Sequence, residues 1–160
     1  MHYYTEAREL IKTGDILGWT HAGGWFKSWY GFKINCVRLF QRSKYSHVGI
    51  AVVLAGRVFI LESVTGGVRL VPLSKFLPCD WADRPAWSGD DLERAMSVCG
   101  EPYSQLEAML GALGENDDAN GQWQCAELVK WACRLDCLAT PAAVMDYALA
   151  TGSSIREIRL

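Results

Sequence analysis

The strongest hydrophobic pattern in the chain is a pair of β-branched runs near its middle. The runs are Ser46–Leu54 and Arg57–Ser63, and only Ala55-Gly56 separates them. A two-residue connection that contains glycine is typical of a tight hairpin turn. These residues therefore predict an antiparallel β-hairpin, and a third short strand, 67–71, is expected to follow it.

Apolar residues at helical spacing predict helices in both halves of the chain. In the N-terminal half, a short helix over 4–12 precedes a strand over 15–19, and 25–41 fits an amphipathic helix. Residues 72–89 hold three of the five prolines and are expected to be irregular. The C-terminal half is expected to be mostly helical, over residues 90–99, 103–113, 123–137 and 141–150.

The order of these elements indicates one α+β domain over residues 1–160. A chain of 160 residues is long enough to bury a core of its own. It contains no internal repeat, low-complexity segment or evident linker. We therefore expect a small antiparallel sheet packed against helices.

The composition is that of an ordinary globular protein, with half of the residues apolar and 21% charged. A formal net charge of −2 argues against a nucleic-acid partner. Residues 25–44 differ from this average, because they contain five basic residues and no acidic one. This stretch could contact an anionic membrane or a cell-wall polymer. The alternative is a helix with a core-facing stripe and a solvated basic face.

Neither a leader sequence nor a metal site is evident. The first twelve residues carry charges throughout, and no apolar stretch approaches the ~18 residues of a membrane helix. The six cysteines form no C-x-x-C pair. The acidic segment 115–121 lacks the ligand spacing of a calcium loop. We therefore expect a reduced, cytoplasmic protein without a metal or another cofactor.

Cys125 is the candidate nucleophile. It opens the apolar-periodic segment QCAELVKWACRL, so it is expected at the N-terminus of a helix. Unpaired N–H groups and a partial positive charge at that end lower the pKa of a thiol and favour the thiolate. The alternative is that Cys125 is a small buried hydrophobic residue, since it lies on the core-facing stripe of the helix.

His47 and Glu62 are the candidate base and its orienting acid. If Ala55-Gly56 forms the turn, Gly49 lies opposite Glu62, and His47 shares their face of the sheet. Diagonal neighbours of this kind lie ~7–8 Å apart at the backbone, within side-chain reach. A carboxylate at the end of an apolar row is costly unless it is paired, and a histidine would relieve that cost. The hairpin thus predicts the histidine–acid half of a catalytic triad.

Three further residues are weaker candidates. Tyr45 lies two positions before His47, so it is expected on the same face, where it would line the cleft or bind substrate. A packing role is the alternative. His21, in the loop after the first strand, is a second candidate for substrate binding, against the alternative of a solvated loop residue. Asp15 is expected to make a structural hydrogen bond to a turn.

Several motifs together resemble the YiiX-type, circularly permuted branch of the NlpC-like cysteine peptidase superfamily. They are GDILGW, RSKYSHVGIAV, VFILES, GGVRLVPL, GEPYS and QCAELVKWA, with the helix start Thr140-Pro141-Ala142. The order histidine, acid, cysteine is the hallmark of this permuted papain-like fold. The resemblance implies Cys125 as nucleophile, His47 as general base and Glu62 as the third member.

The leading hypothesis is therefore a cysteine peptidase or amidase that forms a thioester intermediate. Its expected substrate is an amide bond in peptidoglycan stem peptides. Without a leader, this requires delivery by a phage particle; the alternative is a cytoplasmic substrate. One alternative is a lipid ester or acyl hydrolase, or an acyltransferase, that uses the same site. Another is a non-catalytic binding module of a phage or bacterial assembly.

Overall fold

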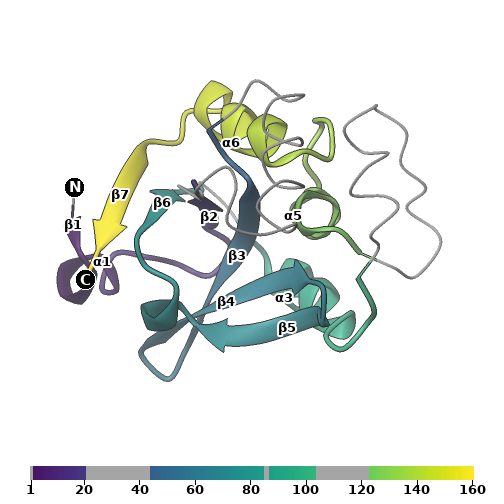
Figure 1. Cartoon of the computed structure of the whole chain (residues 1–160), viewed down its shortest axis with the longest axis horizontal. Helices are drawn as coiled ribbons and strands as arrows, with labels where there is room; N and C mark the ends of the chain where they lie inside the picture. Colours follow the sequence, from purple (N-terminus) through teal and green to yellow (C-terminus); the bar gives the residue numbers. More distant parts are fainter. Residues whose placement is uncertain (1, 21–43, 85–86, 104–122) are drawn as a thin grey trace, which may run out of the picture.

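The computed structural model describes residues 2–20, 44–84, 87–103 and 123–160. Its centre is a seven-stranded sheet in the order β1-β7-β6-β2-β3-β4-β5 (Figure 1). Neighbouring strands are antiparallel except for β1 and β7, which are parallel. The strands are β1 (His2–Tyr3), β2 (Ile16–Trp19), β3 (His47–Leu54), β4 (Arg57–Val64), β5 (Gly67–Pro72), β6 (Cys79–Ala82) and β7 (Ile155–Arg159).

Helices cover both faces of the sheet, which confirms the α+β class. The described helices are α1 (Tyr4–Ala7), α3 (Gly89–Ser97), α5 (Cys125–Cys133) and α6 (Pro141–Ala150), with a short 3₁₀ helix, η1 (Leu73–Lys75). The larger core lies between the sheet and α3, α5 and α6. A smaller core lies on the opposite face, against α1 and η1. None of the helices in the described part of the chain is long and apolar enough to cross a membrane.

The hairpin register is the one that the sequence predicts. The β3–β4 ladder runs from Leu54–Arg57 to Ile50–Leu61, so Ala55 and Gly56 form the turn. Both turn residues have positive φ, 49° and 72°, as a two-residue turn that matches the strand twist requires. This register places His47 and Glu62 on the same face of the sheet, as expected.

The sheet is larger than predicted, and it is not purely antiparallel. β6 lies inside the segment 72–89, which was expected to be irregular, and neither β1 nor β7 is predicted. The reason is that these strands are short and are stabilised by distant partners. β6 fills the gap between β2 and β7. In β7 the apolar residues Ile155 and Ile158 are three positions apart, which hides the two-residue period of a strand.

Two of the predicted helices are clearly shorter than expected, and two others lie wholly or almost wholly outside the described residues. Within 4–12 the helix covers only Tyr4–Ala7, and within 123–137 it covers Cys125–Cys133. The predicted helix 25–41 lies outside the described residues, as does 103–113 except for its first residue.

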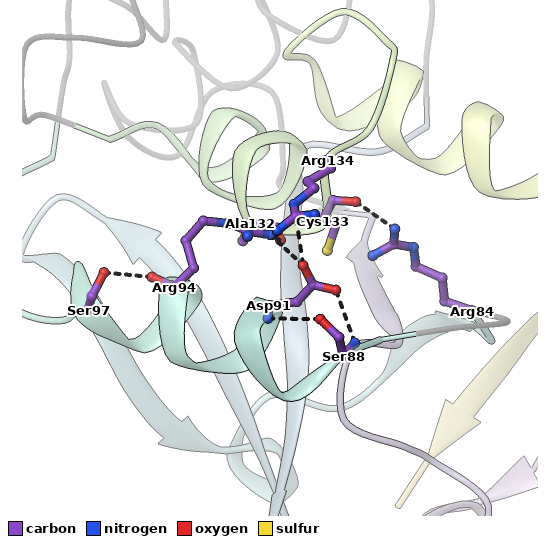
Figure 2. Close-up of polar contacts among 8 residues, drawn as sticks. All are labelled: Arg84, Ser88, Asp91, Arg94, Ser97, Ala132, Cys133 and Arg134. Atoms are coloured by element: carbon purple, nitrogen blue, oxygen red, sulfur yellow. Dashed lines mark hydrogen bonds and ion pairs between the residues drawn. The ribbon is translucent and has the colours of Figure 1, made fainter.

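The C-terminal end of α5 is held by two arginines from the preceding segments (Figure 2). Nη2 of Arg94 donates to the carbonyl of Ala132 at 2.6 Å, and Nη2 of Arg84 donates to that of Cys133 at 2.5 Å. Arg94 also forms an ion pair with Asp91 at 2.6 Å. Cations are favourable here, because the last carbonyls of a helix lack partners and carry partial negative charge.

The N-terminal end of α5 is held by the sheet and by the loop before α6. The hydroxyl of Ser63 in β4 donates to the carbonyl of Trp123 at 2.7 Å, and both groups are buried. Nε2 of Gln124 donates to the carbonyl of Ala139 at 2.6 Å. Gln124 and Glu127 also form a capping box around the first turn. With both ends anchored, α5 presents its first residue, Cys125, at a defined place beside β3 and β4.

We expect Arg94→Met to lower the free energy of unfolding by about 1–3 kcal/mol, because it removes two charge-assisted hydrogen bonds from a largely buried side chain. Urea denaturation measures the change. The matched control is Arg8→Met, whose side chain is exposed and, among the described residues, forms an ion pair with its neighbour Glu9 alone. We expect a change within about 0.5 kcal/mol there. Equal losses in the two variants would contradict this account of α5.

Candidate active site

Cys125 is the first residue of α5, and its thiol is buried against the start of β3. The sulfur is hydrogen-bonded to the His47 ring, and the N–H groups of Val48 and Ala126 donate to it. The N–H of Val48 is available because the β3–β4 ladder ends at Ile50. Burial alone would raise the pKa of the Cys125 thiol. The three partners outweigh it, so this pKa lies below that of an ordinary cysteine.

His47 is the first residue of β3 and links Cys125 to Glu62. Its Nε2 lies 2.6 Å from Oε2 of Glu62, which leaves Nδ1 for the thiol. Burial acts to lower the pKa of His47, but the charges on Cys125 and Glu62 act in the opposite sense and raise it to about 9. The raised pKa of His47 and the lowered pKa of Cys125 together favour a thiolate–imidazolium pair.

Glu62 is almost completely buried and has a second partner, Arg69. Nε and Nη2 of Arg69 donate to Oε1 of Glu62 at 2.9 and 2.7 Å. The two residues lie directly opposite each other in the β4–β5 ladder. Burial would raise the pKa of Glu62, but His47 and Arg69 more than offset it and lower this pKa. Glu62 is therefore an ionised carboxylate at the end of an apolar row.

Two aromatic residues surround this cluster. The Trp19 and His47 rings lie 5.5 Å apart between centroids at 43° to each other, and the two residues are paired across β2 and β3. Nε1 of Trp19 donates to the carbonyl of Phe76 at 2.6 Å. The guanidinium of Arg69 lies 5.6 Å from the centre of the Phe76 ring. These contacts pack aromatic rings beside the part-buried His47 and over the Arg69 partner of Glu62.

The structure confirms the predicted contact between His47 and Glu62 and brings Cys125 to the same place. The catalytic roles of the three residues stay predictions. Asp15 makes the predicted structural bonds: its carboxylate accepts from the N–H groups of Lys12 and Arg84 and from Nε1 of Trp81. His21 lies outside the described residues.

Tyr45 is not on the face of the sheet where the sequence predicts it. Its ring packs in the core with Gly18 and Met145, on the side of Val48. Its hydroxyl donates to Asp80 at 2.7 Å. Burial and this bond raise the pKa of Tyr45 to about 12. The prediction that Tyr45 shares the face of His47 is wrong, because side chains alternate strictly between faces only inside a strand. β3 begins two residues after Tyr45, at His47.

Sequence reasoning missed Arg69, although a signal for it was present. Val64 pairs with Gly67, so Thr65 and Gly66 form the second turn. The pairing argument that places Gly49 of β3 opposite Glu62 applies equally to the next hairpin. There it places Arg69 of β5 opposite Glu62.

The fold and this cluster define an α+β protein with a Cys-His-Glu site between the start of a helix and a β-hairpin. Among solved structures, the chain is similar to one described as the metalloprotein YiiX from Escherichia coli O157:H7, DUF1105, with a TM-score of 0.53 and 18% sequence identity. The match covers 76% of this chain and 63% of that protein, so the chain spans less than two thirds of its length. The chain therefore has a YiiX-like fold.

Two other comparisons give no match. No model of a known protein family matches the chain, and no curated protein matches it. The term metalloprotein describes the YiiX structure. Among the residues described in this chain, no three His, Cys, Asp or Glu side chains are arranged to hold a metal ion. The carboxylate of Glu62 is already bonded through both oxygens, to His47 and to Arg69.

We expect Cys125 to react with iodoacetamide at pH 7 faster than Cys99, although Cys99 is exposed and Cys125 is buried. The reason is that the thiolate is the reacting form: the pKa of Cys125 is lowered, mainly by His47, whereas the pKa of Cys99 is raised by partial desolvation of its thiol. Cys133 is a second reference, because burial raises its pKa to about 12. Mass spectrometry of the labelled peptides gives the three rates. Slower labelling of Cys125 than of Cys99 would argue against a nucleophilic role.

Proposed function

We propose that the chain is a cysteine hydrolase that cleaves an amide bond, in a permuted papain-like fold of the NlpC-like superfamily. One observation carries the proposal: the Cys125 thiol contacts an imidazole whose other nitrogen is bonded to a buried, ionised Glu62. This is the arrangement that activates a thiol for nucleophilic attack. The YiiX-like fold and the order His47, Glu62, Cys125 along the chain support the assignment.

In the acylation step, the Cys125 thiolate attacks the carbonyl carbon of the amide and a carbon–sulfur bond forms. The negative charge moves to the carbonyl oxygen. Backbone N–H groups at the start of α5 are the candidates to stabilise it, and that of Ala126 already lies beside the sulfur. The imidazolium of His47 then gives its proton to the nitrogen, the carbon–nitrogen bond breaks, and an amine leaves.

In the deacylation step, the neutral His47 takes a proton from water, and the hydroxide attacks the thioester carbon. The carbon–sulfur bond breaks, which releases a carboxylic acid and returns the thiolate beside the imidazolium. Glu62 stays ionised throughout and stabilises the imidazolium. The same nucleophile would also form a thioester from an ester substrate, so the site chemistry by itself does not separate the two bond types.

For the substrate we propose peptidoglycan stem peptides, on the strength of the motifs shared with the NlpC-like superfamily. Incubation with purified sacculi and, separately, with lipid acyl esters tests this, with the products identified by mass spectrometry. We expect new amine and carboxyl ends in the sacculi. Release of fatty acid instead would assign ester chemistry to the same site. Cys99→Ser, at an exposed cysteine, is the matched control for Cys125→Ser.

A third outcome would replace the proposal altogether. If neither substrate is cleaved and Cys125→Ser binds sacculi as well as the unchanged protein does, the chain is a binding module.

A further inference from the structure

Arg69 binds only one of the two oxygens of Glu62. Its Nε and Nη2 both donate to Oε1, at 2.9 and 2.7 Å, while Oε2 lies 2.6 Å from Nε2 of His47. Two donors on one oxygen restrict rotation of the carboxylate, so the second oxygen stays directed at the imidazole. We propose that Arg69 is a positioning residue of the Cys-His-Glu site, which holds Glu62 with Oε2 facing the His47 ring.

Arg69 is itself held by residues that lead back to His47. Its guanidinium lies over the Phe76 ring, the Phe76 carbonyl accepts from Nε1 of Trp19, and the Trp19 ring contacts His47. With the bonds that Glu62 makes to His47 and Arg69, these contacts form a closed ring of five residues, one of which is His47 itself. Its members come from β2, β3, β4, β5 and the end of η1. Such a ring resists rotation of His47 away from the thiol.

The permanent charge of arginine gives Arg69 a role that His47 cannot fill. This role rests on the proposed function, in which His47 loses its proton to the leaving group and is neutral until it takes one from water. During that interval Arg69 is the cation that pairs with Glu62, since a guanidinium does not lose its proton. Without it, burial would favour proton uptake by Glu62, and a neutral acid stabilises an imidazolium less well. The groups that lower the pKa of Glu62 are His47 in β3 and Arg69 in β5.

The test compares Arg69→Met, Arg69→Lys and the control Arg57→Met. Arg57 begins the same strand as Glu62 but is exposed at the turn, at the far end of β4. The readout is the rate of Cys125 alkylation by iodoacetamide as a function of pH, followed by peptide mass spectrometry, with the melting temperature recorded in parallel. This readout needs no knowledge of the substrate.

We expect Arg69→Met to move the alkylation midpoint upward by about 0.5–1 pH unit, which is about three- to tenfold slower labelling below the midpoint. Arg69→Lys should recover part of this shift, because an ammonium keeps the charge but not the two-pronged geometry. Arg57→Met should leave the midpoint unchanged.

A lower melting temperature with an unchanged midpoint in Arg69→Met would overturn the proposal, since that is the effect of a purely structural ion pair. If Arg69→Met does not fold, the alkylation midpoint of Arg69→Lys is the test. A midpoint equal to that of the unchanged protein would then overturn the proposal. Failure of the proposed function has a different signature. In that case the unchanged protein itself would show the alkylation midpoint of an ordinary thiol.

Discussion

Replacing Cys125 with serine should reduce turnover on the substrate by about 10³-fold or more, with the fold retained. A hydroxyl is far less acidic than a thiol, so the pairing with His47 that ionises Cys125 would not ionise serine. The replacement is nearly isosteric and should cost at most about 1 kcal/mol of stability at this largely buried position. Turnover is measured on whichever substrate the sacculus or ester assay identifies, with the melting temperature in parallel.

The control for this variant is Cys99→Ser, which should retain full turnover, because Cys99 is exposed in the segment after α3. Wild-type turnover in Cys125→Ser would show that the catalytic interpretation is wrong. A collapse of the melting temperature would instead mark Cys125 as a packing residue.

His47→Ala should have an effect of similar size, because in the proposed mechanism His47 is both the proton donor to the leaving group and the partner of the thiolate. The variant should also raise the pKa of Cys125, since its largest favourable charge is removed while its burial remains. Glu62→Gln should reduce turnover less, because glutamine keeps an acceptor for the imidazole but not the charge. The combined variants should not add, since the three residues act as one unit.

The pH dependence of the unchanged protein provides an independent test of this pair. The reactive form needs Cys125 without its proton and His47 with its proton. Turnover should therefore rise as Cys125 loses its proton, at a pH below that of an ordinary thiol, and fall as His47 loses its proton near pH 9. A profile that instead rises around the ordinary pKa of a cysteine, with no fall near pH 9, would rule out a thiolate–imidazolium pair.

Local sequence was sufficient for the hairpin and for two members of the site. Gly56 adopts a positive φ without steric cost, and the two-residue turn that it forms with Ala55 sets the register of β3 against β4. Because side chains alternate with a period of two, the register alone places His47 and Glu62 on one face. Their 2.6 Å contact follows from residues that lie only fifteen positions apart.

The position of Cys125 beside His47 depended on tertiary structure. The sequence placed Cys125 at the start of a helix, but its distance from His47 is set by how α5 docks on the sheet. That docking is fixed by bonds between distant residues, such as Ser63 to Trp123 and Arg94 to Ala132. The resemblance to a known family, rather than periodicity, connected Cys125 with the hairpin beforehand.

What the sequence by itself determined is therefore the local order: the hairpin, its register, and a cysteine that opens a helix. What only the tertiary structure decided is how those pieces meet and what surrounds them. β6 and β7 are strands because the sheet offers them partners, and Tyr45 turns away from His47 because β3 has not yet begun. The ring of contacts through Arg69, Phe76 and Trp19 likewise joins residues from five elements. Periodicity reports only which face a residue occupies, whereas contacts between elements depend on packing across the whole core.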